Sequence, residues 1–181
     1  MGTKCNKKTY EFLKNMETNL APIILFVYNR PWHTQQTVEA LQKNELAEKS
    51  ELFIYADGAK KEKDHKVEDV RELIKKITGF KSVTIVERKK NLGLTDNIID
   101  RVTEIVNKYG KIIVLEDDLV SSVGFLSYMN DAPEMYKDEE KVISITGYTY
   151  PVKKKLPETF FIKGTSCWSW ATWKRGWDIF N

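Results

Sequence analysis

Residues 111–122 read KIIVLEDDLVSS, and this stretch decides the expected fold. Its apolar residues run directly into three carboxylates, Glu116, Asp117 and Asp118. A short, continuous apolar run is typical of a buried strand, which would end where the carboxylates begin. Because neighbouring carboxylates repel one another, the end of this strand is expected to lie against a positive group.

Strands and helices alternate along the chain around this stretch. Short apolar runs predict strands over residues 22–28, 51–57, 82–88 and 111–117. Apolar residues at helical spacing predict helices over residues 29–44, 64–79, 94–110 and 121–138, the last strained at Pro133. Shorter strands are expected over residues 141–146 and 159–164. The alternation favours an α/β fold, with a mostly parallel, Rossmann-like sheet and helices on both faces.

Capping residues set the expected ends of these helices. Pro31 suits the first turn of the first helix, and Gly79 and Gly110 are expected to end the second and third. Thr95 or Asp96 can cap the start of the third helix, and a serine is expected to cap the helix that starts at residue 121.

The composition suits one globular domain. The chain has 181 residues, of which 41% are hydrophobic and 30% are charged. A formal charge of +3 does not argue for a nucleic-acid partner, although basic residues cluster at 60–66, 88–90 and 153–155. The two cysteines are far apart and form neither a disulfide framework nor a zinc pattern, which favours a reducing compartment.

The chain carries no apolar run long enough to span a bilayer, and residues 1–20 lack the apolar core of a signal peptide. We interpret residues 1–20 as a leader or a loosely held helix and residues 21–181 as one domain. A cytoplasmic protein is expected. The basic clusters would tolerate a peripheral position at the inner face of the membrane.

Polar residues follow three of the predicted strands at the point where each strand ends. Asn29 and Arg30 follow the first strand, Asp57 and Gly58 the second, and the acidic triplet (residues 116–118) the fourth. The carboxyl ends of parallel strands share one edge of a sheet, and ligands bind at that edge in this fold class. We therefore expect these residues to converge on one rim.

The acidic triplet allows two interpretations. Asp118 or Ser121 could simply cap the next helix, because side-chain oxygens satisfy the free amides at a helix start. Alternatively the triplet could bind Mn²⁺ or Mg²⁺, since hard cations often combine one or two carboxylates with phosphate oxygens and water. A metal that arrives with a diphosphate would suit sugar transfer from a nucleotide-sugar, because negative charge grows on the leaving diphosphate.

The first predicted turn excludes several nucleotide-binding enzymes. It reads YNRPWHT and lacks both the G-x-G-x-x-G of dinucleotide-binding folds and the G-x-x-x-x-G-K-[ST] of phosphate-binding loops. The glycine-rich loop that is usual in sugar nucleotidyltransferases is missing there too. A nest of glycines in the first loop is therefore not expected to hold a pyrophosphate.

Four segments resemble a known family when they are taken together and in order. They are APIILFVYNRP, YADGAK, NLGL and IIVLEDDLVSSVGFLSYMNDAPEMYKDEEKVISITGY. They resemble nucleotide-sugar glycosyltransferases of the GT-A fold, of the type of the family-2-like bacterial sugar transferases. The segment around the triplet is also similar to the animal N-acetylglucosaminyltransferase I. The resemblance covers residues 21–178, and its most specific piece is the strand with EDDL followed by the aromatic helix FLSYM.

The resemblance implies roles for the acidic triplet and for a basic residue. Asp118, the last carboxylate of what corresponds to the family's DXD motif, would ligate the metal, and Asp117 would lie next to the ribose of the donor. Glu116 belongs to the same donor-binding motif. Arg30 matches a basic residue beside the nucleotide, although by itself it could be a solvated residue ahead of a helix.

The resemblance also implies a site for the base of the nucleotide. Asp57 matches the aspartate that reads the base, typically uracil, and Asn91 and Gly93 match a loop that borders the donor. The residues alone leave other roles open, because Asp57 with Gly58 could form a simple turn and residues 91–93 an ordinary loop.

Four of the five tryptophans lie in CWSWATWKRGW, at positions 168, 170, 173 and 177. Positions 170, 173 and 177 repeat at helical spacing, which predicts a helix that packs in the core and carries Asp178. Indole rings also stack on the apolar faces of sugars. In the families that the chain resembles, this segment lies close to the donor sugar and the acceptor, so Trp168 and Trp170 are candidate sugar or acceptor contacts.

An inverting sugar transferase needs a general base, usually Asp or Glu, near the acceptor hydroxyl. In the resembling families this base follows the tryptophan segment, and here Asp178 is the one acid that does so. The base is therefore Asp178 or a residue beyond Asn181. We expect a missing acceptor-binding part, so that this chain binds nucleotide with metal and transfers sugar poorly.

The sequence thus predicts a metal-dependent glycosyltransferase of polysaccharide biosynthesis. It would move a hexosyl or N-acetylhexosaminyl group from a nucleotide-sugar, expected to be a UDP-sugar, to a saccharide acceptor. Two alternatives stay open, a non-catalytic nucleotide- or glycan-binding module of the same fold and a sugar-phosphate nucleotidyltransferase. A structural α/β domain whose carboxylates only cap a helix would show no metal-dependent ligand binding.

Overall fold

The computed structural model describes residues 19–61 and 64–180. The leader or loosely held helix expected over residues 1–20 lies outside these ranges, except for residues 19 and 20. Within the described ranges, no helix combines the length and the apolar character needed to cross a membrane.

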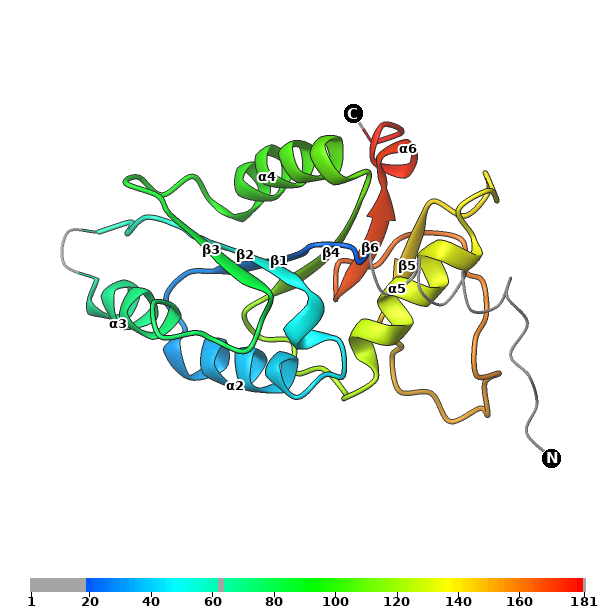
Figure 1. The fold of residues 1–181 in the computed structure, drawn as a ribbon, viewed down its shortest axis with the longest axis horizontal. Coiled ribbons are helices and arrows are strands. Elements are labelled where there is room, and N and C mark those ends of the chain that lie inside the picture. The colour runs from blue at the N-terminus through cyan, green and yellow to red at the C-terminus, as the bar shows by residue number, and fades with distance from the viewer. Residues whose placement is uncertain (1–18, 62–63, 181) are drawn as a thin grey trace.

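The described residues form a six-stranded sheet in the order β3-β2-β1-β4-β6-β5 (Figure 1). The strands are β1 (Ile23–Val27), β2 (Glu51–Ala56), β3 (Ser82–Glu87), β4 (Lys111–Glu116), β5 (Ser144–Thr146) and β6 (Trp170–Trp173). The pairs β3–β2, β2–β1 and β1–β4 are parallel, whereas β6 is antiparallel to both β4 and β5. The expected α/β class with a mostly parallel sheet is confirmed.

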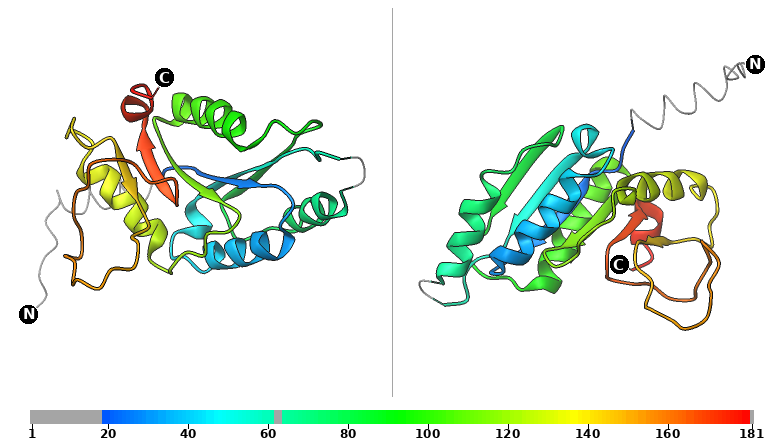
Figure 2. Two further views of the ribbon diagram at one scale, coloured as in Figure 1. Left: turned by 180° about the vertical axis from the view of Figure 1, so that it is seen from behind. Right: turned by 90° about the horizontal axis from the view of Figure 1, so that it is seen from below.

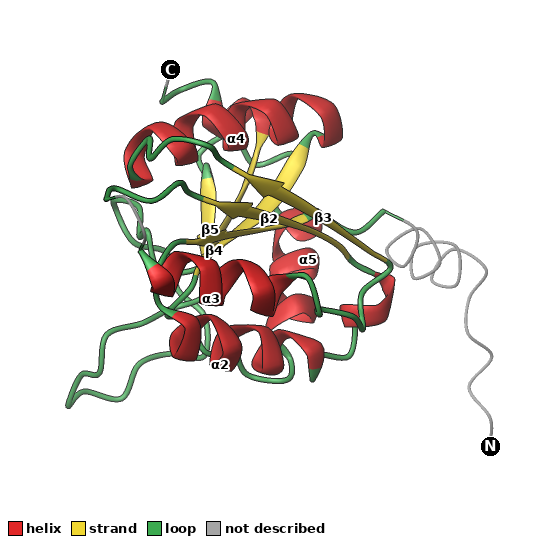
Figure 3. Cartoon of the chain, turned by 90° about the vertical axis from the view of Figure 1, so that its left-hand side faces the viewer, coloured by secondary structure: helices red, strands yellow, loops and turns green. Residues whose placement is uncertain are grey.

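Helices cover both faces of this sheet (Figure 3). They are α2 (Pro31–Gln42), α3 (His65–Ile74), α4 (Leu94–Tyr109), α5 (Phe125–Met135), α6 (Lys174–Trp177) and the 3-10 helix η1 (Ala47–Lys49). The core has a part on each face. On one face Leu25 of β1 joins a cluster with Val38 of α2, and on the other Ile24 joins a cluster with Val102 of α4. Burial on both faces explains why β1 is continuously apolar.

The start of α4 differs from the sequence prediction. Neither Thr95 nor Asp96 caps this helix, which begins at Leu94 with Gly93 as its N-cap. Gly93 has a φ of 80°, a left-handed conformation that favours glycine, so the loop can turn into the helix before the expected caps. The end of α4 is as expected, because Gly110 is the C-cap with a φ of 79°.

Two other helix ends also differ. α3 ends at Ile74 and not at Gly79, and the residues between them form turns in which the Ile77 amide donates to the Ile74 carbonyl at 3.2 Å. α5 begins at Phe125, after the N-cap Gly124, and not at a serine. The helix runs through Pro133, which lies in its last turn.

The tryptophan segment forms a strand where a helix was expected. Residues 170–173 are β6, and only Lys174–Trp177 is helical, because β6 pairs with strands on both of its sides. The prediction that this segment packs in the core is confirmed, since Trp173 and Trp177 are each 8% exposed.

Residues 147–169 form a long loop at the end of the molecule that carries α5 and β5 (Figure 2). The strand expected over residues 159–164 lies in this loop and is not formed. Phe161 and Ile162 are 71% and 56% exposed, so this apolar run lacks the neighbouring strand that would pair with it and cover it.

Candidate functional site

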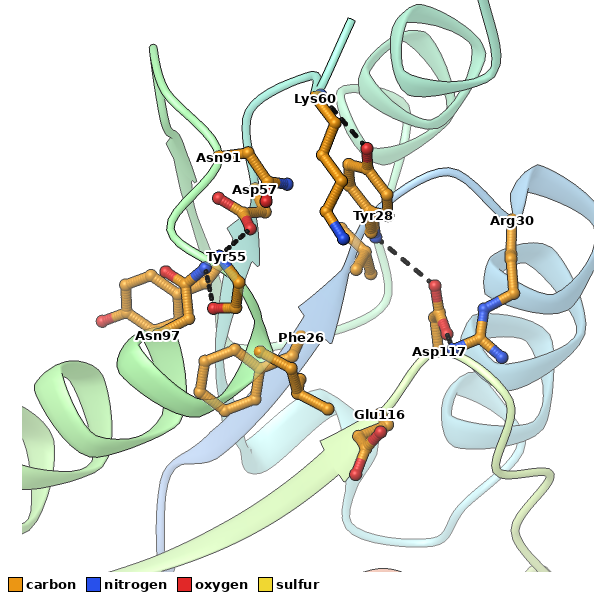
Figure 4. Close-up of a pocket in the computed structure, with 13 residues that line it drawn as sticks. Phe26, Tyr28, Arg30, Tyr55, Asp57, Lys60, Asn91, Asn97, Glu116 and Asp117 are labelled. Carbon is orange, nitrogen blue, oxygen red and sulfur yellow. Dashed lines mark hydrogen bonds and ion pairs between the residues drawn. The ribbon is translucent and has the colours of Figure 1, made fainter. Parts of the chain in front are cut away.

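A pocket of about 160 Å³ opens at the carboxyl edge of β1, β2 and β4 (Figure 4). Pockets that enclose a whole drug-sized ligand measure about 300–1,000 Å³, so this one has room for one end of a larger ligand. The polar side chains in its lining belong to Tyr28, Arg30, Tyr55, Asp57, Lys60, Asn91, Asn97, Glu116 and Asp117. Residues that were singled out in four separate parts of the sequence therefore meet here.

Asp57 fastens the loop ahead of α4 to the end of β2. Its Oδ1 accepts hydrogen bonds from the amides of Gly58 at 2.8 Å and Leu92 at 3.0 Å, and its Oδ2 accepts one from the Gly93 amide at 3.0 Å. Asn91 adds a bond of 2.7 Å from its Nδ2 to the Gly58 carbonyl. Residues 91–93 are thus a braced loop at the pocket wall.

Gly58 lets these two loops approach each other. A Cβ at this position would lie 2.4 Å from the carbonyl carbon of Lys90, 2.6 Å from its oxygen and 2.8 Å from the nitrogen of Asn91. Real side chains do not tolerate such distances to backbone atoms, so a larger residue would push the loops apart. The pair Asp57-Gly58 therefore does more than close a turn.

Arg30 is the positive group that the end of β4 was expected to meet. Its Nη2 lies 3.0 Å from Asp117 Oδ1, and its Nη1 donates to Asp118 Oδ2 at 2.7 Å. The Asp117 side chain is 3% exposed and also accepts a bond of 3.4 Å from the Tyr28 amide. The Arg30 side chain is 46% exposed, so its guanidinium can contact a ligand while it compensates a buried carboxylate.

The capping interpretation of the acidic triplet is wrong. No side chain of residues 118–121 caps α5, whose N-cap is Gly124. Asn44, which follows α2, serves this helix start instead, because its Oδ1 accepts a bond of 2.9 Å from the Leu126 amide. Ser121 Oγ accepts a bond of 3.2 Å from Asn44 Nδ2. The triplet is therefore left for another role.

The carboxylates of the triplet have different surroundings. Burial raises the pKa of Glu116, the neighbouring Asp118 and Asp117 raise it further, and Arg30 opposes the shift. Burial also raises the pKa of Asp117, while Arg30 and the Tyr28 amide oppose that shift. The carboxylate of Glu116 has no hydrogen-bond partner among the described residues, so its oxygens are open to a ligand.

The donor set at the triplet fits a metal ion that arrives with its ligand. Among residues 19–61 and 64–180, no group of three His, Cys, Asp or Glu side chains could hold a metal by itself. Mg²⁺ and Mn²⁺ often take only one or two carboxylates and complete their coordination with phosphate oxygens and water. Asp118, whose side chain is 39% exposed, offers such a carboxylate beside the pocket.

The strand β6 starts at this same edge of the sheet. Trp170 pairs with Val114 of β4 and with Thr146 of β5. Trp168 precedes the first residue of β6 by two positions, and Ser169 between them has a φ of 50°, so the chain turns as it enters the strand. The indole of Trp170 itself stacks on Trp177 at a centroid distance of 5.9 Å and supports the core.

An aromatic cluster lies in the loop that connects β5 and β6. The ring of Trp168 lies 4.7 Å from that of Tyr148 and 5.3 Å from that of Tyr150, measured between centroids. Trp168 is 40% exposed and Tyr150 is 62% exposed. Of the two tryptophans singled out in the sequence, Trp168 thus presents a ring to solvent, within a cluster of aromatic side chains.

Asp178 lies at the opposite edge of the sheet. Because β6 is antiparallel to β4, its last residue, Trp173, pairs with Lys111 at the start of β4. Asp178 follows α6 there, and its two carboxylate oxygens lie 2.7 and 2.8 Å from Lys174 Nζ. The structure does not bring Asp178 to the pocket.

Four polar residues of the pocket lining were missed in the sequence: Tyr28, Tyr55, Lys60 and Asn97. Asn97 gave no signal of its own, because it lies within the predicted helix. Tyr28 directly follows β1 and Tyr55 is in β2 one residue before its end, so their positions at strand ends were the available signal. Lys60 was masked by the basic cluster around it. Its amide donates to the Tyr28 hydroxyl at 3.2 Å, and this bond ties the loop after β2 to β1.

The chain matches no protein-family model and no curated protein sequence. Solved structures do match. One is the mannosyltransferase PcManGT from Pyrobaculum calidifontis in complex with GDP-Man and Mn²⁺, at 13% identity and a TM-score of 0.47. Two others are S. aureus TarS and TarS 1–349, both at 14% identity, with TM-scores of 0.45 and 0.44.

These matches cover 76%, 77% and 76% of this chain and 41%, 24% and 41% of the respective matched chains. The chain therefore spans less than half the length of each. Because the TM-scores lie below 0.5, the matches assign no activity, donor or metal to this chain.

Proposed function

We propose that this chain is a glycosyltransferase domain of the GT-A type, which binds a UDP-sugar along the carboxyl edge of its sheet and transfers the sugar to a saccharide acceptor. The observation that carries the proposal is the meeting of Arg30, Asp57, Glu116 and Asp117 around one pocket, from the ends of three different strands. Ligands of open α/β sheets bind at that edge. The pocket offers a cation and several acceptors, which a nucleoside diphosphate requires.

The base of the donor would lie at the Asp57 end of the pocket, with Asn91 and Gly93 at its border. Asp57 is held there by the loop it braces, so its carboxylate is pre-positioned. Its remaining capacity as an acceptor suits an imide N–H such as that of uracil.

The ribose and the diphosphate would follow along the rim. Glu116 would accept a hydrogen bond from a ribose hydroxyl, because its side chain has no hydrogen-bond partner in the described part of the chain. Asp117 would lie next to the ribose, although its side chain is 3% exposed and already binds Arg30 and the Tyr28 amide. The exposed guanidinium of Arg30 suits a phosphate, because its planar set of donors matches two phosphate oxygens.

Asp118 would hold the divalent cation, Mn²⁺ or Mg²⁺. When bound, the cation supplies positive charge that offsets the negative charge developing on the departing diphosphate. Arg30 contacts the same carboxylate, so it must share Asp118 or move toward the phosphates when a donor binds.

The sugar would lie beyond the triplet, against Trp168. The rim has the order β2, β1, β4, β6. The base, diphosphate and sugar would therefore follow the same order as Asp57, Arg30 with the triplet, and Trp168. Exposed aromatic faces stack on the apolar faces of pyranoses. Trp170 would act indirectly, because its ring packs in the core below this surface.

Transfer would join an acceptor hydroxyl oxygen to the anomeric carbon and break the bond from that carbon to the diphosphate. The hydroxyl proton must pass to a base. Asp178 is not placed to receive it, because it lies at the far edge of the sheet with Lys174. Donor hydrolysis and transfer assays are therefore needed beside binding.

The test is calorimetric titration of UDP into the protein with Mn²⁺ and with a chelator. The variant Asp118→Ala removes the proposed metal ligand and keeps the Arg30–Asp117 pair, and Asp138→Ala is the control at an exposed carboxylate outside the pocket lining. We expect UDP binding to require both the metal and Asp118. Binding that ignores the chelator would remove the metal from the proposal, and failure of all nucleoside diphosphates to bind would overturn it.

A further inference from the structure

We propose that Lys60 and Asp57 together select nucleotides whose base carries a ring N–H next to a carbonyl, as in uracil and guanine, against cytosine and adenine. This inference rests on the proposed function, because it names the base specificity of the same pocket. It adds a residue, Lys60, to which no role was given above.

Lys60 is a cation of the pocket that has no carboxylate partner among residues 19–61 and 64–180. Its side chain points into the pocket in Figure 4, and no ion pair with Lys60 occurs in the described part of the chain. The backbone amide of Lys60 donates a hydrogen bond to the Tyr28 hydroxyl oxygen at 3.2 Å, which holds the loop in place. The Nζ of Lys60 lies 6.0 Å from the centroid of the Tyr28 ring. The ammonium therefore keeps its three donors for water or a ligand.

Asp57 retains one place for an acceptor bond. A carboxylate has about four acceptor positions, two on each oxygen. Oδ1 uses both of its positions on the amides of Gly58 and Leu92, whereas Oδ2 uses one on the Gly93 amide. A single further donor from a ligand can therefore bond to Oδ2.

The two asparagines of the pocket are used to brace the loop ahead of α4. Asn91 donates to the Gly58 carbonyl at 2.7 Å. Asn97 donates to the Gly93 carbonyl at 3.2 Å and accepts a bond of 3.2 Å from Arg88 Nε. Asn91 keeps a second N–H and its Oδ1, so Lys60 and Asp57 are the charged donor and the charged acceptor at this end of the pocket, and Asn91 is a neutral group beside them.

A donor beside an acceptor distinguishes the four bases. Uracil and guanine present a carbonyl oxygen next to a ring N–H, so the carbonyl can accept from Lys60 while the N–H donates to Asp57. Cytosine and adenine present an amino group next to an unprotonated ring nitrogen. In the same position the amino group would face the ammonium of Lys60, donor against donor, and the ring nitrogen would face a carboxylate.

The location of Lys60 favours a contact with the base over one with the phosphates. Lys60 follows Asp57 by three residues on the loop after β2, whereas the cation suited to the phosphates, Arg30, follows β1 and contacts the end of β4. A base contact depends on which base is present, while a phosphate contact does not. This difference allows an experiment to separate them.

The experiment is titration of UDP, CDP, GDP and ADP, with Mn²⁺, into wild-type protein, Lys60→Met and Lys60→Arg. Lys61→Met is the matched control, because Lys61 is the next residue, is exposed, and does not line the pocket. Unfolding midpoints in urea establish that each variant is folded. We expect wild type and Lys61→Met to bind UDP and GDP about 10-fold or more tighter than CDP and ADP.

In Lys60→Met, UDP and GDP are expected to lose about 10-fold in affinity while CDP and ADP do not weaken, so the preference collapses. Lys60→Arg should keep the preference, because it keeps the donor. An equal loss for all four nucleotides would mean a phosphate contact and would overturn the inference, as would an unchanged preference in Lys60→Met. If none of the four binds to wild type, the proposed function itself fails.

Discussion

Replacing Asp57 by asparagine tests how the rim of the pocket is held together. The change keeps the shape of the side chain but removes its charge and one acceptor oxygen. Asparagine can still accept from the amides of Gly58 and Leu92 through its oxygen, but its NH₂ group then faces the Gly93 amide, 3.0 Å from the lost oxygen position.

The magnitude follows from the three bonds that Asp57 accepts. A hydrogen bond to a charged group contributes about 1.5–3 kcal/mol, and a neutral one about 0.5–1.5 kcal/mol. The substitution removes one charged bond, converts the other two to neutral bonds, and leaves the Gly93 N–H without a partner. These changes together amount to about 3.5–6 kcal/mol. Because the bonds from the Leu92 and Gly93 amides are only partly buried, water replaces part of the loss, and we expect the free energy of unfolding to fall by about 2–4 kcal/mol.

Urea denaturation followed by tryptophan fluorescence measures this loss, and amide hydrogen exchange locates it. In Asp57→Asn, the exchange of the Leu92 and Gly93 amides should be accelerated relative to wild type by more than the exchange of the β1 amides. Asp69→Asn makes the same chemical change at an exposed position of α3 and should alter stability by less than about 0.5 kcal/mol. Unchanged stability of Asp57→Asn, with unchanged exchange at residues 92 and 93, would refute the bracing role.

Three further changes probe other parts of the molecule. Gly58→Ala should cost about 1–3 kcal/mol in unfolding free energy, because its Cβ would meet backbone atoms of Lys90 at 2.4 and 2.6 Å, whereas Gly124→Ala, with no atom within 4 Å, should be neutral in the same urea titration. Burial raises the pKa of Tyr55 to about 12 from 10.0, so the neutral phenol is favoured in the folded state. The stability that the buried Tyr55 phenol contributes is complete below pH 10 and is lost as the pH rises toward 12. At pH 11 the unfolding free energy of wild type should have fallen by about 1 kcal/mol more than that of Tyr55→Phe. Equal losses in the two proteins would contradict the raised pKa of Tyr55. Trp168→Ala should leave the calorimetric affinity for UDP unchanged but weaken binding of a UDP-hexose by about 2-fold to 10-fold, and a loss shared by UDP would argue against a sugar contact.

The alternating elements of the first two thirds of the chain were predictable because each is encoded locally. Continuous apolar runs such as that of β1 are buried on both faces, and Pro31 and Gly110 mark helix ends by backbone constraints of their own. The last third was less predictable. Tryptophans at positions 170, 173 and 177 satisfy a helical spacing, but β4 and β5 are far away in sequence and their edges decide in favour of a strand.

The candidate site divides in the same way. The residues at strand ends could be predicted to converge, because parallel strands place their carboxyl ends on one edge. The sequence could not predict which of these charged side chains would pair with one another. Arg30 and Asp117 are 87 positions apart in the sequence, and the choice between a bound cation and this guanidinium depends on side-chain geometry. Lys60 was indistinguishable from its solvated basic neighbours until its loop was seen to bond to Tyr28.

Asp57 binds the loop ahead of α4 through backbone amides, and this determines which sequence changes the loop can accept. No side chain of residues 92 and 93 takes part in the contact, so position 92, where Leu92 is 40% exposed, is open to replacement by residues of other sizes and charges. The length of the loop is fixed instead, since one inserted or deleted residue would displace an amide by about 3.8 Å from its carboxylate. Related chains can therefore differ at position 92, which does not line the pocket, but they should keep the spacing from Asn91 to α4.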